Sequence, residues 1–116
     1  ALKVALADRG SAPTLVFDEI DTGVGGAVAD AIGQRLARLA SRVQVLAVTH
    51  APQVAARAGG HFQIAKGAAG KGKRVATRIT PLADEARREE IARMLSGATI
   101  TPEARAAAGK LLQGAG

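Results

Sequence analysis

Two adjacent acids, Asp18 and Glu19, stand near the end of an apolar run at residues 14–20. One carboxylate can hold Mg²⁺, usually with waters completing the coordination shell, while its neighbour orients or deprotonates an attacking water. The pair therefore indicates magnesium-dependent nucleotide chemistry. The plainer alternative is two acids that only end a strand.

A second polar pair, Thr49 and His50, ends another apolar run at residues 43–50. If both runs are parallel strands, their carboxyl ends lie at one edge of the sheet, where open α/β sheets bind ligands. An imidazole at that edge could donate a hydrogen bond to a phosphate oxygen or help to position water. His61 has no such partner in the sequence, and we expect it to be structural.

The elements that must position these residues form a βαβ unit. The run at residues 14–20 is apolar on both faces, which is typical of a buried parallel strand. Apolar residues then recur at helical spacing over residues 28–39, before the second strand at 43–50. A strand, a helix and a strand within about 35 residues form such a unit.

Beyond this unit, Pro52 is expected to open a short helix that two glycines end. Alternating residues at 62–64 and 75–79 predict an antiparallel hairpin with a glycine-rich loop. Asp84 is expected to cap a further helix, and residues 101–102 to begin the last one.

The opening stretch, residues 1–7, resembles the end of a helix whose beginning is missing, so we expect the chain to be a fragment. Its 116 residues suffice for one domain at most.

The composition excludes several kinds of site. The chain has no Cys, which excludes disulfides, Cys-based zinc sites and thiol nucleophiles, and its two His are too few for a dedicated metal cage. No apolar run approaches the roughly 18 residues of a membrane span. We therefore expect a soluble, cytoplasmic protein without a membrane partner.

The net charge of +6 is unevenly placed, because the stretch at residues 57–78 is basic and holds no acid. Such a cluster could contact nucleic acid phosphates, although a solvated loop gives the same count. The candidate DNA contacts are Lys71, Lys73 and Arg74.

The sequence also resembles a known family. Residues 14–26, TLVFDEIDTGVGG, look like the Walker B strand and following loop of the RecN family of bacterial DNA repair proteins. Residues 48–56, VTHAPQVAA, resemble that family's switch-histidine segment. Residues 90–97, EIARMLSG, followed by Ile100 and Thr101, are similar to its C-terminal helix.

This resemblance implies a function and a set of roles. RecN proteins are SMC-like members of the ABC-type ATPases, in which two heads sandwich ATP, and they serve recombinational repair of double-strand breaks. The resemblance implies that Asp18 is the Mg²⁺-side acid, Glu19 the catalytic base and His50 the γ-phosphate sensor. It also implies a D-loop that passes along the dimer interface, formed by Asp21, Thr22, Gly23, Val24, Gly25 and Gly26.

Two alternatives remain open. A transporter subunit of the same superfamily is disfavoured, because Ile20 replaces the usual transporter Pro and Gly25 falls where transporters and SMC proteins commonly carry an acid. A small basic nucleic-acid-binding module without an ATPase role is weakened by the scarcity of aromatic residues for base stacking, which are only Phe17 and Phe62.

The sequence contains no phosphate loop of the form Gly-x-x-x-x-Gly-Lys-Ser/Thr, no Ser-Gly-Gly signature and no coiled coil. We therefore expect residues 1–116 to be the C-terminal part of an ABC-type ATPase head, with a partial α/β P-loop NTPase fold, and to be inactive alone. The expected cofactors are ATP and Mg²⁺. The expected partners are the N-terminal part of the same head, a second head in an ATP-sandwiched homodimer, and DNA at the nucleoid.

Overall fold

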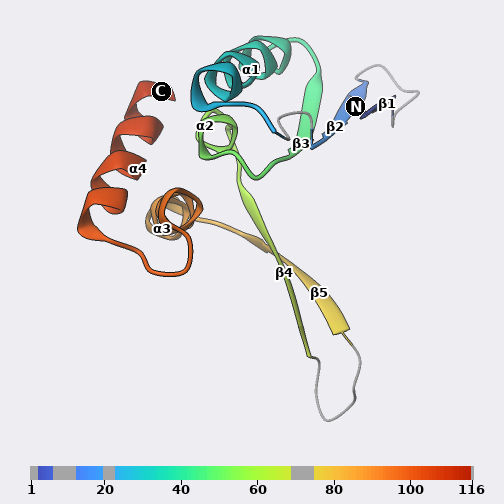
Figure 1. Cartoon of the computed structure of the whole chain (residues 1–116). Coiled ribbons are helices and arrows are strands. Elements are labelled where there is room, and N and C mark those ends of the chain that lie inside the picture. Colours follow the sequence, from blue (N-terminus) through green and yellow to red (C-terminus); the bar gives the residue numbers. More distant parts are fainter. Residues whose placement is uncertain (1–2, 7–12, 20–22, 69–74, 116) are drawn as a thin grey trace.

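The computed structural model describes residues 3–6, 13–19, 23–68 and 75–115, and it has an α/β arrangement with two small sheets (Figure 1). The elements follow one another as β1 (Lys3–Leu6), β2 (Thr14–Asp18), α1 (Gly26–Leu39), β3 (Gln44–Val48), α2 (Pro52–Ala55), β4 (Phe62–Ala68), β5 (Val75–Pro81), α3 (Asp84–Ser96) and α4 (Pro102–Ala115).

The predicted βαβ unit is confirmed. Strands β2 and β3 pair in parallel, with Thr14 opposite Gln44 and Asp18 opposite Val48, and α1 connects them. The hydroxyl of Thr14 donates to Oε1 of Gln44 at 2.6 Å, which adds a side-chain bond at the start of both strands. The two strands therefore end at the same edge of the sheet.

The expected helical end at residues 1–7 is wrong for the part that the structure describes. Residues 3–6 form β1, which pairs antiparallel with β2, with Leu6 opposite Leu15. Ala and Leu favour helices, but that preference is weak, and pairing with a neighbouring strand overrides it. The pairing gives the backbone groups along one edge of β2 their hydrogen-bond partners.

Helices α1 and α2 pack closely at Gly33. A Cβ atom on Gly33 would lie 3.0 Å from the carbonyl oxygen of Gln53 and 3.0 Å from Cγ of Arg57. An ion pair at 3.1 Å between Asp30 and Arg57 supports the same contact. The short helix α2, which begins at Pro52 as predicted, is thereby fixed against α1.

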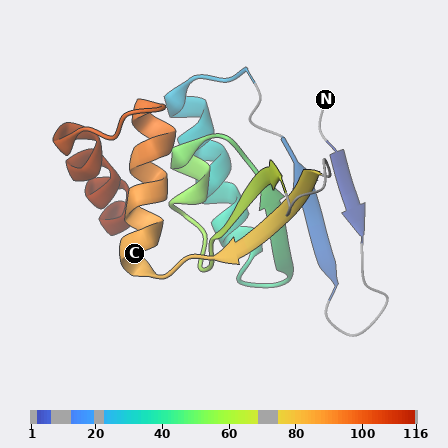
Figure 2. The same cartoon turned by 90° about the horizontal axis from the view of Figure 1, so that it is seen from below.

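The main hydrophobic core lies where α2, α3 and α4 meet, and its buried residues are Ala55, Ala56, Ile91, Ala92, Ala104 and Ala108. Seen from below, the helices lie to one side of the three-stranded sheet, and α4 is the farthest from it (Figure 2). The small side chains allow the three helices to approach one another closely. Asp84 is the first residue of α3 and not its cap, because the N-cap is Ala83 and makes no side-chain cap bond.

The predicted hairpin is confirmed as the antiparallel pair β4 and β5, with Ile64 opposite Ile79. It extends away from the helices (Figure 1), and the side chains of Phe62, Ile64 and Ile79 are exposed.

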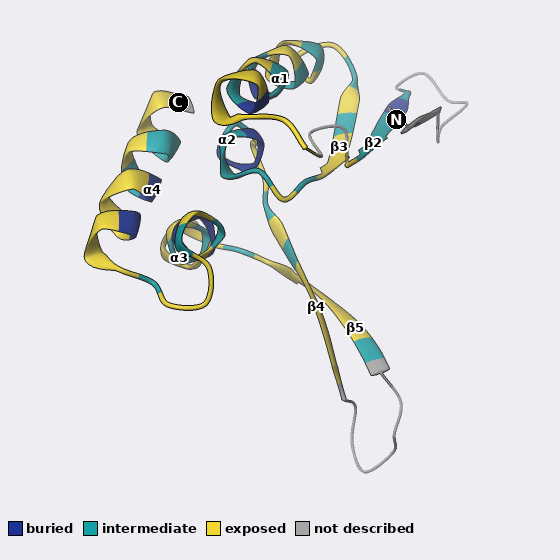
Figure 3. Cartoon of the chain, viewed as in Figure 1, coloured by how far each residue is buried: buried dark blue, intermediate teal, exposed yellow. Residues whose placement is uncertain are grey.

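Strand β3 is less buried than its apolar sequence suggests. It lies at the edge of its sheet, no described strand pairs with its outer side, and Leu46 is 49% exposed. Strand β2, expected to be buried, has Thr14 buried and its other residues half-buried (Figure 3). An apolar run predicts the strand, but the number of neighbouring elements decides its burial.

Candidate functional site

The predicted acids lie at the carboxyl end of β2. Asp18 is the last residue of the strand and is half-buried, and Glu19 follows it. The main-chain N–H of Glu19 donates to the carbonyl oxygen of Val48 at 2.9 Å, so it extends the pairing with β3 by one bond. Glu19 has a φ of 52°, an uncommon value for a residue other than glycine. Such conformations are often found at functional sites.

The structure brings His50 to Glu19. The Nε2 atom of His50 lies 3.4 Å from Oε1 of Glu19, and the two side chains are 85% and 53% exposed. The parallel pairing of β2 and β3 places the two residues at one edge, as the sequence predicts. An accessible carboxylate and imidazole at this distance can share a bound water, since the carboxylate accepts and the imidazole can donate or accept.

A turn into α2 follows His50. The hydroxyl oxygen of Thr49 accepts a hydrogen bond at 2.9 Å from the main-chain N–H of Ala51, and Pro52 then begins the helix. Proline suits this first helical position because its φ is already fixed and it has no N–H that needs a partner. His50 thus stands between β3 and α2, with main-chain bonds holding the backbone on both sides.

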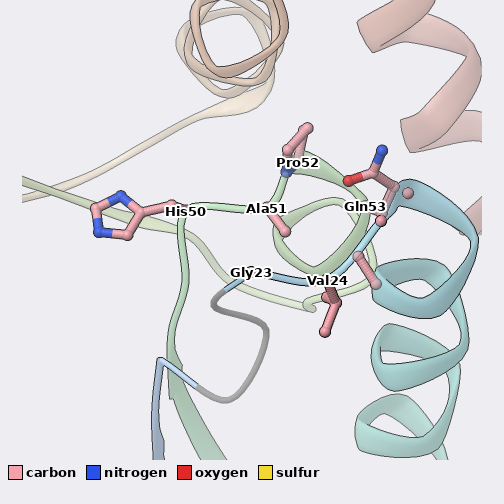
Figure 4. Close-up of a pocket in the computed structure, with 9 residues that line it drawn as sticks. Gly23, Val24, His50, Ala51, Pro52 and Gln53 are labelled. Atoms are coloured by element: carbon pink, nitrogen blue, oxygen red, sulfur yellow. The ribbon is translucent and has the colours of Figure 1, made fainter.

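A hollow of about 340 Å³ joins the segment after His50 to the predicted D-loop. Figure 4 shows the residues that line it: Gly23, Val24, Gly25, Gly26, Ala29, His50, Ala51, Pro52 and Gln53. Gly23 has a φ of 78°, which a residue with a side chain rarely adopts, so glycine suits this turn. Asp21 and Thr22, which were also predicted for the D-loop, lie outside the described residues.

The donor atoms at this edge suit Mg²⁺. Magnesium prefers oxygen ligands and is usually bound by one or two carboxylates together with substrate phosphates and waters. Asp18 and Glu19 are carboxylates of this kind. The described residues contain no cluster of three or more Asp, Glu or His side chains that could hold a metal ion without a substrate.

A second polar cluster, which sequence reasoning missed, holds α2 from the other side. Nη2 of Arg87 in α3 donates to the carbonyl oxygens of Ala55 and Ala56 at 3.1 and 3.3 Å, and it also donates to that of Ala58. These carbonyls lie at the end of α2, where helices lack internal partners for their C=O groups. No sequence pattern links Arg87 to α2.

The same region contains His61 and Glu90. Burial lowers the pKa of His61, and the nearby Arg87 charge lowers it further, while Glu90 opposes the change. Nδ1 of His61 is buried and has no hydrogen-bond partner among the described residues. Glu90 is buried, accepts hydrogen bonds from Arg93 and from Gln63, and has a pKa below its usual range chiefly because of the Arg93 bond.

The remaining predicted site residues lie outside the described part of the chain. Lys71, Lys73 and Arg74 belong to the connection between β4 and β5, which residues 69–74 form. Their contact with DNA stays a prediction. Within the described residues no helix is long and apolar enough to cross a membrane.

The fold and this edge together define an α/β domain in which two parallel strands bring a pair of acids and a histidine to one edge of the sheet. No family model matches the chain. The chain does match one portion of RecN, which confirms the resemblance drawn from its motifs.

Three similar proteins, each called DNA repair protein RecN, illustrate this match. The protein of Xylella fastidiosa strain Temecula1 is 51% identical over 113 residues, which are 97% of this chain and 20% of the relative. That of Rickettsia felis is 47% identical over 112 residues, 97% of this chain and 20% of the relative. That of Halalkalibacterium halodurans is 43% identical over 101 residues, 87% of this chain and 18% of the relative. The chain therefore spans about a fifth of the length of the curated relatives it matches.

Proposed function

We propose that this chain forms part of the ATPase head of a RecN-type DNA repair protein, and that ATP hydrolysis at the edge of β2 and β3 serves recombinational repair of double-strand breaks. The observation that carries the proposal is the approach of His50 to Glu19 at 3.4 Å, beside Asp18, in a chain that matches RecN over 97% of its length.

The geometry supports a division of roles at this edge. Asp18, half-buried at the end of its strand, is suited to hold Mg²⁺ through water. Glu19 is accessible, so it can take the proton of an attacking water. His50 is more exposed still and can donate to a γ-phosphate oxygen while its contact with Glu19 keeps the two groups together. When bound, Mg²⁺ would neutralise charge on the phosphate oxygens.

The proposal extends to the parts of the head that this sequence does not contain. A phosphate loop supplies the main-chain N–H groups and the Lys that hold a triphosphate, and none occurs in these 116 residues. We therefore assign the chain to a P-loop NTPase fold completed by the rest of the same head. A second head would complete the ATP site along the segment at residues 23–26, with DNA as the partner of the assembled protein in the cytoplasm and at the nucleoid.

The test is Glu19→Gln in the full-length protein. The amide keeps the shape of the side chain but cannot accept a proton, so ATP binding should persist while single-turnover hydrolysis falls by roughly 10²-fold or more. Glu103→Gln is the matched control, because Glu103 is an exposed acid in α4, away from this edge. If Glu19→Gln hydrolyses ATP at about the wild-type rate, Glu19 is not the base.

A further inference from the structure

Three arginines gather at the C-terminal end of α1. A shallow hollow of about 560 Å³ is lined by Arg35, Arg38, Leu39, Ser41 and Arg42, and all three arginines are exposed. Their spacing of three and four residues places them on one face of the helix and of the turn that continues it. The main-chain N–H of Arg42 donates to the carbonyl oxygen of Leu39, so the turn after α1 keeps a helix-like hydrogen bond.

The fold itself makes no use of these charges in the described part of the chain. The ion pairs there employ other basic residues, which are His50, Arg57, Arg93 and Arg105. Asp30, which also lies on α1, is already engaged by Arg57 at 3.1 Å and by Gln34 at 2.9 Å. The guanidinium groups of the cluster therefore have no carboxylate partner among the described residues.

Helix capping does not account for the arginines either. Cationic side chains near a helix C-terminus often bond its last carbonyl groups. Here the carbonyl of Arg38 accepts from both the N–H and the hydroxyl of Ser41. The carbonyl of Leu39 accepts from the N–H groups of Arg42 and Val43. These end carbonyls are satisfied by the turn, so the guanidinium groups remain available to an external anion.

We propose that this arginine cluster, formed by Arg35, Arg38 and Arg42, binds the phosphate backbone of duplex DNA. The proposal rests on the proposed function in that it takes DNA as the partner of the assembled protein. A planar guanidinium matches the geometry of a phosphate and can bind two of its oxygens. The three arginines are exposed and line one surface hollow, which suits a backbone rather than a single enclosed anion.

The dimensions of the cluster fit several phosphates. Arg35 and Arg38 lie about 4.5 Å apart along the axis of α1, and Arg42 follows in the turn after Leu39. One strand of duplex DNA carries a phosphate about every 3.4 Å along its helix axis, so each of the three arginines can meet a phosphate of its own.

The cluster is separate from the proposed hydrolysis site. Helix α1 has 14 residues and is about 21 Å long, with Gly26 at the hollow beside His50 and the arginines at the opposite end. DNA could therefore occupy the cluster without covering Asp18 or Glu19. Substituting the arginines should leave basal ATP hydrolysis unchanged.

The experiment measures binding of the full-length protein to a labelled duplex oligonucleotide over a series of salt concentrations. The variant Arg35→Ala/Arg38→Ala/Arg42→Ala should flatten the plot of log affinity against log salt by about 0.9 for each phosphate that the protein no longer neutralises, about 2.7 in all. The variant with Lys at the same three positions keeps the charges and should retain most of the slope. The control Arg88→Ala/Lys110→Ala removes two exposed charges from α3 and α4 and should leave the slope unchanged.

Two results would overturn the inference: an unchanged slope in the triple alanine variant, or an equal reduction per charge in the control. If the wild-type protein binds DNA and the triple alanine variant has the same salt slope, only this inference is refuted. Wild-type protein that does not bind DNA refutes both the inference and the DNA partner of the proposed function. Basal ATP hydrolysis is measured in parallel. It tests the proposed hydrolysis site at the edge of β2 and β3, whatever the outcome for the arginine cluster or for DNA binding.

Discussion

Glu19 shows how much of a site depends on one residue's backbone. Its N–H continues the pairing of β2 with β3, and its φ is positive. A glycine would adopt this conformation more easily, so the backbone geometry alone does not explain why a glutamate stands here. A strained residue that also carries an ionisable group is best explained by a use for that group.

At the same scale, His61 predicts a pH dependence. Burial holds the pKa of His61 below its ordinary value, with Arg87 adding to the effect and Glu90 opposing it. The unfolded chain therefore binds a proton at His61 more readily than the folded chain does. The region should be most stable above a pH of about 6.5, and its stability should decline as the pH falls below that value.

Hydrogen exchange of the full-length protein can measure this effect as protection factors for β4 and α3. Protection should fall between about pH 7.5 and about pH 5.5 in the wild type, across the ordinary histidine pKa. Because His61→Asn removes the titrating group, the decrease should be smaller in that variant. An equal decrease in both proteins would assign the pH dependence to other groups.

At the scale of the elements, the packing of α1 against α2 depends on Gly33. A Cβ there would lie 3.0 Å from the backbone oxygen of Gln53, which cannot move without moving α2. Gly33→Ala should therefore destabilise this packing by about 1–3 kcal/mol, although alanine alone favours a helix by about 1 kcal/mol. Hydrogen exchange in α1 and α2 is the measurement.

The matched control for this change is Gly109→Ala in α4. A Cβ on Gly109 would meet nothing within 4 Å, so only the gain in helix propensity of about 0.5–1 kcal/mol should remain. The two variants should thus change protection in opposite directions. If Gly33→Ala protects α1 and α2 as well as the wild type does, the close approach of these helices is not limiting.

Another element, α2, links the candidate site to the C-terminal helices. It follows His50 directly, α1 packs on one side of it, and Arg87 of α3 bonds the carbonyls at its end. Helix α3 is joined in turn to α4 by an ion pair at 2.8 Å between Glu89 and Arg105. The position of His50 therefore depends on helices that lie far along the chain.

For the whole molecule, the structure predicts that these 116 residues alone do not bind ATP. Asp18 and Glu19 bring two negative charges, and His50 brings one weak donor, so without a phosphate loop the edge should repel a triphosphate. Magnesium dehydrates reluctantly and usually needs phosphates that are already held in place. We expect no saturable Mg-ATP binding below millimolar concentration and no hydrolysis.

Calorimetric titration of the isolated chain with Mg-ATP measures this directly, after circular dichroism has confirmed that the helices are formed. A micromolar dissociation constant that Asp18→Ala abolishes would show a complete nucleotide site within these residues. The assignment of the chain to one part of a head would then be wrong.

Local patterns in the amino-acid sequence predict the elements and the edge of the sheet that carries the acids. The apolar runs at residues 14–20 and 43–50 predict two strands, the helical spacing between them predicts α1, and Pro52 marks the start of α2. These features follow from periodicity and turn chemistry, which depend on residues close together in the chain. The parallel pairing of the two strands follows from the helix that connects them.

The packing partner of each element follows from contacts between residues that are distant in the chain. Lys3–Leu6 became a strand because β2 offered a free edge, and β3 kept Leu46 exposed because no described element covers it. The hydrogen bonds of Arg87 to the end of α2 and the close approach at Gly33 join residues far apart in the sequence. Burial and pairing are set by partners distant in the chain, and a local pattern carries no information about which partners are present.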